Sequence, residues 1–279
     1  MADPRLTPAR GDIAAKHLEG QVTADRFVAG ETLVVGAPIA PLRLLPHSGA
    51  EQATQALKGE RVTIYDRNGE GWAWGQLASD GYVGWLPEAA LAAPGAAPTH
   101  RISVLRSFAF PGPSIKLPPV ETLPMGSTFA VIREEASFVV TQEGWFVPKQ
   151  HVADLDHVEP DFVAVAVRFA GTPYLWGGKS SLGIDCSGLV QVALNATGVA
   201  CPRDSDMQLA ALGRTLDGGD PLRRGDLIFW KGHVAIVSDA DTLVHANAFH
   251  MATAIEPIIE AIARIKASGS EVLAIKRLD

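Results

Sequence analysis

The sequence is poor in cysteine, with only Cys186 and Cys201 among 279 residues. A small secreted scaffold held by disulfides needs several pairs, and a cytosolic thiol is normally kept reduced. We therefore expect no disulfide framework. A lone cysteine is more often a packed core residue than a reactive one, so a chemical role for either thiol must be argued from its surroundings.

Long apolar runs are also absent. No stretch approaches the roughly 20 apolar residues that a membrane-spanning helix needs. Charged residues interrupt positions 1–20, where a signal peptide would carry its apolar segment. The sequence therefore predicts a cytoplasmic protein with no membrane span, unless a leader precedes it.

Positive charge is in the minority. The chain has 24 Lys and Arg against 31 Asp and Glu, a formal charge of −7, and its basic residues form no dense cluster. This balance argues against nucleic acid or an anionic membrane surface as the main partner. Hydrophobic residues make up 47% and charged residues 20%, as in soluble globular proteins with substantial cores. The length predicts two or three domains.

The first 155 residues contain short apolar segments separated by Gly and Pro, a pattern that predicts small β-barrels. A weak repeat is present at a spacing of roughly sixty residues. Its paired segments are IAPLR at 39–43 and ISVLR at 102–106, the Gly59 and Gly126 turns, and GWLP at 84–87 and GWFVP at 144–148. Residues 92–98 have the Ala/Pro/Gly composition of a linker. We predict an N-terminal extension plus first barrel over 1–95 and a second barrel over 99–155.

The pattern changes after residue 156, where helical and strand segments are mixed. Helices are expected over 160–170, from Cys186 to Gly198, and over 256–266. Strands are expected over 226–230, 233–237, 242–245 and 271–276. Helices followed by an antiparallel sheet predict an α+β domain over 156–279.

Cys186 lies where a loop meets the start of a predicted helix, in the segment DCSG at 185–188. The positive end of the helix dipole stabilises a thiolate, which is the competent nucleophile. Free backbone N–H groups in the first turn can stabilise the oxyanion that forms when a carbonyl is attacked. The position therefore favours a nucleophilic role for Cys186.

Two histidines can supply the base that such a nucleophile needs. His233 opens an apolar strand, and His245 lies near the end of the next one. A tight turn over 239–241 would bring the two imidazoles side by side, so that His245 orients His233. Cys186, Cys201, His233 and His245 could instead ligate zinc, but no CxxC or HxxxH pair is present. His250 is assigned no chemical role.

Five motifs carry a specific family resemblance. They follow in order as YLWGG at 174–178, DCSGLV at 185–190, RRGDLIF at 223–229, GHVAI at 232–236 and HA at 245–246. Together they resemble the NlpC/P60 family of papain-like cysteine peptidases over roughly 158–279. The upstream repeat resembles bacterial SH3 domains. The subgroup that the chain resembles most is the γ-D-glutamyl-L-diamino acid endopeptidases.

The resemblance implies a papain-like α+β catalytic domain preceded by two small SH3-like β-barrels, and it assigns roles to particular residues. Cys186, His233 and His245 match the nucleophile, the base and the orienting residue. Tyr174 matches a tyrosine near the oxyanion site. The residues that match substrate contacts are Asp185, Ser187 and Ser205 in the catalytic domain and Tyr82 and Glu51 in the first barrel. In that subgroup the first barrel closes the cleft, so that only a free N-terminal L-Ala fits, and Asp185 suits its ammonium group.

The implied reaction is hydrolysis of the γ-D-Glu–diamino acid bond in murein peptides such as L-Ala-γ-D-Glu-diaminopimelate, without a cofactor and without a metal. In the cytoplasm this activity would serve peptide recycling. Two alternatives stay open on the sequence. The same chemistry serves amidases and acyltransferases on other substrates, and the barrels could make the chain a wall-peptide binding module.

Overall fold

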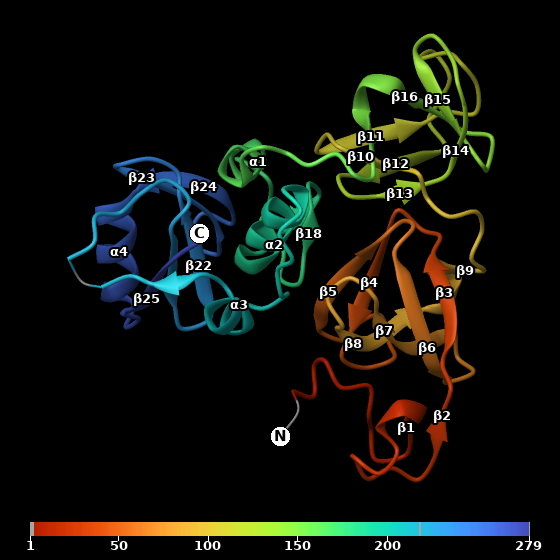
Figure 1. The fold of residues 1–279 in the computed structure, drawn as a ribbon, viewed down its shortest axis with the longest axis horizontal. Coiled ribbons are helices and arrows are strands. Elements are labelled where there is room, and N and C mark those ends of the chain that lie inside the picture. Colours follow the sequence, from red (N-terminus) through yellow and green to blue (C-terminus); the bar gives the residue numbers. More distant parts are fainter. Residues whose placement is uncertain (1–2, 218, 279) are drawn as a thin grey trace. The chain divides into compact units, whose positions relative to one another are not determined.

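The computed structural model describes residues 3–217 and 219–278, which form two compact units, 1–157 and 158–279. The first unit is built from short strands, and the second combines helices with a larger sheet (Figure 1). Each unit has a hydrophobic core of its own.

A seven-stranded antiparallel sheet forms the first barrel. Its strand order is β5-β4-β8-β7-β6-β3-β9, and breaks in register bend β4 and β6 so that the sheet can curl. The strands are β3 (Glu31–Val35), β4 (Ile39–Arg43), β5 (Gln52–Leu57), β6 (Arg61–Arg67), β7 (Trp72–Leu77), β8 (Val83–Pro87) and β9 (Leu91–Ala92). The N-terminal extension, with β1 (Ala14–Ala15) and β2 (Phe27–Val28), inserts Ile13 against Trp74, Val83 and Trp85.

Three small sheets form the second barrel around a core that includes Ile102, Leu123 and Val147. The strands are β10 (His100–Ile102), β11 (Arg106–Ala109), β12 (Glu121–Pro124), β13 (Thr128–Phe129), β14 (Val131–Glu134), β15 (Phe138–Thr141), β16 (Phe146–Pro148) and β17 (Val152–Asp154). The two barrels contact one another at the Gly59 turn, where Thr128 N–H donates to the carbonyl of Lys58 at 2.9 Å.

The second unit is centred on a six-stranded antiparallel sheet with the order β20-β25-β21-β22-β23-β24. Its strands are β20 (Arg214–Thr215), β21 (Leu227–Trp230), β22 (His233–Val237), β23 (Thr242–Asn247), β24 (Ala252–Pro257) and β25 (Val272–Arg277). The central strands β21, β22 and β23 are almost wholly buried. That burial explains why they read as continuous apolar runs in the sequence.

Four helices accompany this sheet: α1 (Phe162–Arg168), α2 (Cys186–Ala196), α3 (Ser205–Ala211) and α4 (Ile258–Ala267). A short hairpin, β18 (Lys179–Ser180) and β19 (Gly183–Ile184), precedes α2. α2 packs against β22 and β23 with its buried apolar positions, whereas α4 places Ile258 and Ala261 in the core with Leu243. α2 ends next to Gly198, whose φ of +79° suits a helix stop.

One boundary differs from the sequence prediction. The helix expected over 256–266 begins at Ile258, because residues 252–257 continue the sheet as β24, paired with β23. Glu256 therefore lies on a strand, opposite Leu243. β24 alternates half-buried and exposed residues, so it lacked the apolar run that identified its neighbours. α3 and β20 were also not predicted.

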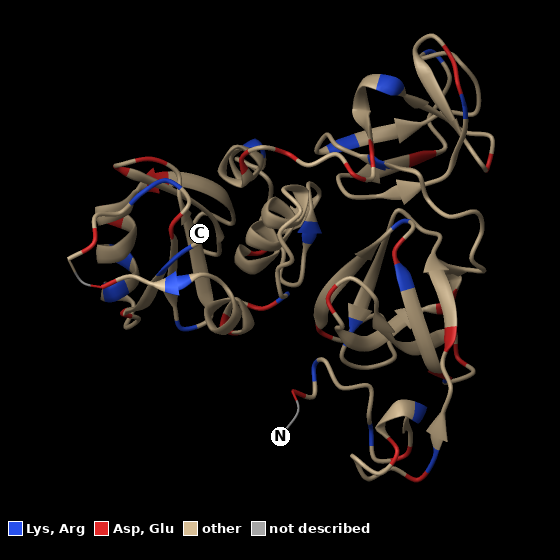
Figure 2. Ribbon diagram, viewed as in Figure 1, with Lys and Arg blue, Asp and Glu red and all other residues tan. Residues whose placement is uncertain are grey.

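Charged residues of both signs are interspersed over the ribbon of each unit (Figure 2). Within residues 3–217 and 219–278, no helix combines the length and apolar character that crossing a membrane requires.

Candidate active site

Cys186 is the first residue of α2, and its side chain is 7% exposed. Burial, together with the negative charge of Asp185, raises the pKa of its thiol to about 12. The backbone N–H groups of Val234 and Ser187 interact with the sulfur and oppose this rise, as does the charge of Arg203. The thiol is therefore protonated at rest and gains its negative charge only as a base removes the proton.

Asp185 caps α2 by accepting a hydrogen bond from Gly188 N–H at 2.7 Å. Its second oxygen accepts from Gly177 N–H at 2.8 Å. Arg203 binds both oxygens, at 2.9 and 2.6 Å, and the two side chains are 1% and 9% exposed. Both oxygens are thus occupied by donors of the chain itself. These contacts make Asp185 a structural residue and disfavour the predicted binding of a substrate ammonium.

Ser187 belongs to the same buried network. Its hydroxyl accepts a hydrogen bond from Arg203 at 2.9 Å and donates to Asp185 at 3.3 Å, while its carbonyl accepts from Gln208 at 2.9 Å. Arg203 and Gln208 were not predicted as residues of the site. Their signal was weak, because an arginine or glutamine near a helix start is most often on the surface.

The two predicted histidines do lie side by side. His233 and His245 come from β22 and β23, and His233 Nε2 is 2.8 Å from His245 Nδ1. His245 is 1% exposed, and the ring of Trp230 lies 5.6 Å from the ring of His233. Val234, which interacts with the Cys186 sulfur, directly follows His233. The fold thus brings the cysteine and the histidine pair to the same end of β22.

Glu256 extends this pair, and the sequence analysis missed it. His245 Nε2 lies 2.6 Å from Glu256 Oε1, and Arg264 of α4 contacts the same carboxylate oxygen. His245 pairs with Ala254 across the β23–β24 ladder, so Glu256, two residues further on, shares its face of the sheet. Only correct assignment of β24 would have revealed this contact.

Both imidazoles are neutral at rest. Burial, followed by the charges of neighbouring groups, lowers the pKa of His233 to about 3, and burial with the charges of Arg264 and His250 lowers that of His245 to about 3. An imidazole in a dry, positively charged setting loses its proton readily. His233 therefore has a free lone pair over the whole neutral range and can accept a proton.

Tyr174 is held close to this centre by its backbone, which donates to the carbonyl of Met251 at 2.9 Å and bridges to Ile184. Burial and the nearby Cys186 sulfur raise the pKa of its phenol. The phenol thus keeps its proton and can donate a hydrogen bond, as a residue near an oxyanion must.

The remaining predicted contacts lie in three places. Ser205 is the half-buried first residue of α3. Tyr82 is 5% exposed and packed within the first barrel, just before β8, whereas Glu51 is exposed before β5. Their contact with substrate stays a prediction.

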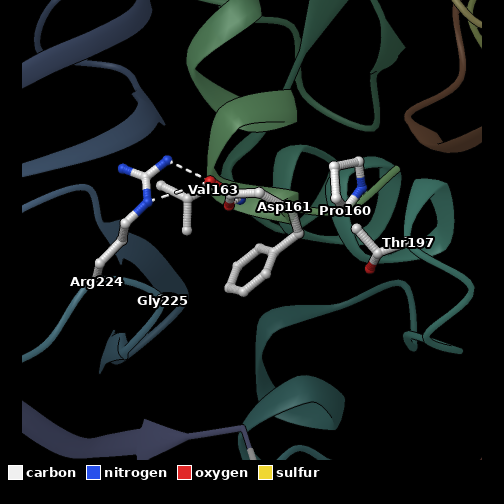
Figure 3. A pocket seen from close by; sticks show the side chains of 7 residues that line it. Pro160, Asp161, Val163, Thr197, Arg224 and Gly225 are labelled. Carbon is white, nitrogen blue, oxygen red and sulfur yellow. Dashed lines mark hydrogen bonds and ion pairs between the residues drawn. The ribbon is translucent and has the colours of Figure 1, made fainter. Parts of the chain in front are cut away.

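Two other features have some of the properties of a binding site. Ligand atoms of His245, His250 and Glu256 lie within 4.8 Å of one another, but Arg264 holds Glu256 and its charge opposes a cation, so we assign no metal there. A shallow pocket of about 360 Å³ is lined by Pro160, Asp161, Phe162, Val163, Thr197, Arg224 and Gly225 (Figure 3). It includes none of the residues around Cys186, and its Arg224–Asp161 ion pair, 2.7 Å long, connects the start of α1 to the turn before β21.

The second unit has a cysteine at the start of a helix, packed on an antiparallel sheet that carries two paired histidines. This arrangement defines a papain-like cysteine peptidase. Residues 171–263 match the NlpC/P60 family, and residues 42–91 match the bacterial dipeptidyl-peptidase SH3 domain. The chain thus carries an NlpC/P60 domain, preceded by a bacterial SH3 domain.

Named relatives cover different parts of the chain. A dipeptidyl-peptidase 6 from Lysinibacillus sphaericus is 37% identical over 37% of this chain, which spans only 38% of that relative. A γ-D-glutamyl-L-lysine dipeptidyl-peptidase from Bacillus cereus is 28% identical over 74% of this chain and 70% of its own length. The crystal structure of an NlpC/P60 protein from Bacillus cereus shares the fold, with a TM-score of 0.75, 21% identity, and coverage of 88% of this chain and 99% of that one.

Proposed function

We propose that the chain hydrolyses the γ-D-glutamyl–diamino acid bond of murein peptides that carry a free N-terminal L-Ala. The observation that carries the chemistry is the neutral His233–His245 pair on strands of which one, β22, also contacts the buried Cys186 sulfur through Val234 N–H. The substrate class is suggested by the Bacillus cereus relative, whose match spans both units.

In the proposed reaction, His233 takes the proton of Cys186 as the sulfur attacks the γ-carbonyl of D-Glu. The oxyanion is stabilised by backbone N–H groups at the start of α2 and by the protonated phenol of Tyr174. His233 then protonates the departing amine of the diamino acid, which leaves an acyl-enzyme on Cys186. Water, activated by His233, releases L-Ala-D-Glu and restores the thiol.

Selection of the free amine needs a carboxylate with an unoccupied oxygen. Asp185 does not offer one, because Arg203 and two backbone N–H groups occupy its oxygens. Among the predicted contacts this leaves the exposed Glu51 of the first barrel for the ammonium, with Tyr82 beside the peptide. We further propose that the enzyme acts in the cytoplasm, where it degrades recycled murein peptides.

The test is hydrolysis of L-Ala-γ-D-Glu-diaminopimelate and of its N-acetylated form, followed by mass spectrometry. We expect cleavage of the free peptide only. Cys186→Ala should lower the rate by roughly 10⁴-fold or more, whereas Cys201→Ala, the matched control at the other thiol, should stay within a few-fold of the parent. Glu51→Gln should raise KM for the free peptide.

Equal cleavage of both peptides would remove the amine requirement. Activity that survives in Cys186→Ala would remove the nucleophile. Turnover of other acyl substrates, with none of the tripeptide, would favour the amidase or acyltransferase alternative.

A further inference from the structure

The hydrogen-bond chain behind His233 continues past His245. It runs from β22 through β23 to Glu256 near the end of β24, where Arg264 of α4 contacts the same carboxylate. We propose that Glu256 is a positioning residue that fixes the tautomers of both histidines, so that His233 presents an unprotonated Nδ1 to the nucleophile. The proposal rests on the cysteine-peptidase chemistry and not on the identity of the peptide.

The direction of the chain follows from what each atom can do. An ionised carboxylate only accepts hydrogen bonds, so His245 must donate to Glu256 from Nε2 at 2.6 Å. A neutral imidazole carries one proton, and therefore His245 Nδ1 is an acceptor. The contact of 2.8 Å then requires His233 Nε2 to be the donor. With its proton on Nε2, His233 has its lone pair on Nδ1.

Arg264 keeps Glu256 in the acceptor state. Its guanidinium contacts Oε1 of Glu256 and also lies 4.3 Å from the centre of the Phe249 ring, so it is held from two sides. The Glu256 side chain is 11% exposed, and because a guanidinium only donates hydrogen bonds, Oε1 accepts from Arg264 as well as from His245.

The charges around the histidines predict a signature in pH dependence. The neighbouring groups whose charges act on them are His250 from the turn after β23, Glu256 from β24 and Arg264 from α4. The positive charge of Arg264 lowers the pKa of His233, whereas the negative charge of Glu256 raises it. Removal of the Arg264 charge should therefore raise the pKa of His233, and removal of the Glu256 charge should lower it.

The experiment compares Glu256→Gln with Arg264→Gln, and uses Glu260→Gln as the matched control. Glu260 is an exposed residue in the first turn of α4 and carries the same charge as Glu256. Two readouts need no substrate: long-range ¹H–¹⁵N NMR of the histidine tautomers, and the pH profile of Cys186 alkylation by iodoacetamide, followed by mass spectrometry. Hydrolysis of the tripeptide adds kcat and KM.

In the parent, both histidines should carry their proton on Nε2. Glu256→Gln can accept or donate, so it should give mixed tautomers and a roughly 10- to 100-fold fall in kcat with little change in KM. Its alkylation profile should move to lower pH, whereas that of Arg264→Gln should move to higher pH with the tautomers retained. Glu260→Gln should match the parent.

A parent spectrum with the His233 proton on Nδ1 would overturn the proposal, even if Glu256→Gln failed to fold. So would unchanged tautomers in Glu256→Gln, or shifts of the same sign in both charge variants. If the parent is alkylated as expected but does not cleave the tripeptide, the substrate assignment fails and the tautomer proposal stands.

Discussion

Two carboxylate–arginine pairs support the catalytic residues, one beside Cys186 and one behind His245, and they differ in which of their polar atoms the fold already uses. On the helix side, Asp185 and Arg203 are buried together, and their polar atoms bind the α2 cap, the Gly177 backbone and Ser187. On the strand side, Glu256 shares one oxygen between Arg264 and His245. The first pair holds the nucleophile in place, whereas the second continues into the base.

The difference shows that residue type does not fix function in this site. Asp185 adjoins Cys186 in sequence and looked like a specificity residue, yet its oxygens are consumed by the fold. Glu256 is distant in sequence and was predicted only as the start of a helix, yet it contacts the orienting histidine. The state of a carboxylate depends on how many donors the fold already gives it.

The largest effect is expected from Arg203→Gln. It leaves the buried Asp185 carboxylate without its charge partner, and breaking a buried pair in this way costs about 3–5 kcal/mol of unfolding free energy. Chemical denaturation of the second unit, followed by hydrogen exchange of the β22 and β23 amides, measures it. The double variant Asp185→Asn/Arg203→Gln removes both charges and should be less destabilised than the single one; equal or greater loss would deny that the pair acts as a charge pair.

A more gradual effect is expected from pH. His233 and His245 have folded pKa values near 3, below the usual value of about 6.5 for an unfolded histidine. Below pH 6.5 the two histidines are protonated in the unfolded chain but stay neutral in the folded one. Their contribution to the free energy of unfolding is therefore complete above that pH and falls as the pH drops towards 3. Each histidine contributes up to about 1.4 kcal/mol per pH unit. Between pH 6 and 4, the free energy of unfolding of His245→Gln should change less with pH than that of the parent. Equal slopes in the variant and the parent would contradict the lowered pKa of His245.

The catalytic centre could be predicted where its residues lie in recognisable patterns of adjacent residues in the sequence. The helix start at Cys186 can be recognised from the residues next to it. The same holds for the two apolar strands, of which the first begins at His233 and the second carries His245 near its end. The hairpin between these strands brings the two imidazoles together. The α+β class and the SH3-like barrels follow from the same local patterns.

The second layer of the site could not be predicted in this way. Arg203 reaches Asp185 only because the chain between them folds back beneath α2, and no periodicity indicates a fully buried arginine. Glu256 was placed on a helix because the residues after it have helical spacing, although pairing with β23 extends the sheet to Pro257. Non-local pairing overrides propensity at such boundaries.

The smallest effect on stability is expected from Arg264→Gln, and it distinguishes the strand-side pair from the helix-side pair most directly. The Arg264 side chain is 25% exposed and Arg203 only 1%, so water can replace much of what Arg264 gives to Glu256. Partly exposed pairs are worth roughly 0–1 kcal/mol. The same substitution at two arginines, measured by the same denaturation, should therefore differ by at least about 2 kcal/mol. An equal loss at both positions would mean that the strand-side pair is as structural as the helix-side pair. A small loss of stability in Arg264→Gln, together with an upward shift in the pH profile of Cys186 alkylation, would show that the two pairs have different roles. The helix-side pair would hold the nucleophile in place, and the strand-side pair would act on the histidine base.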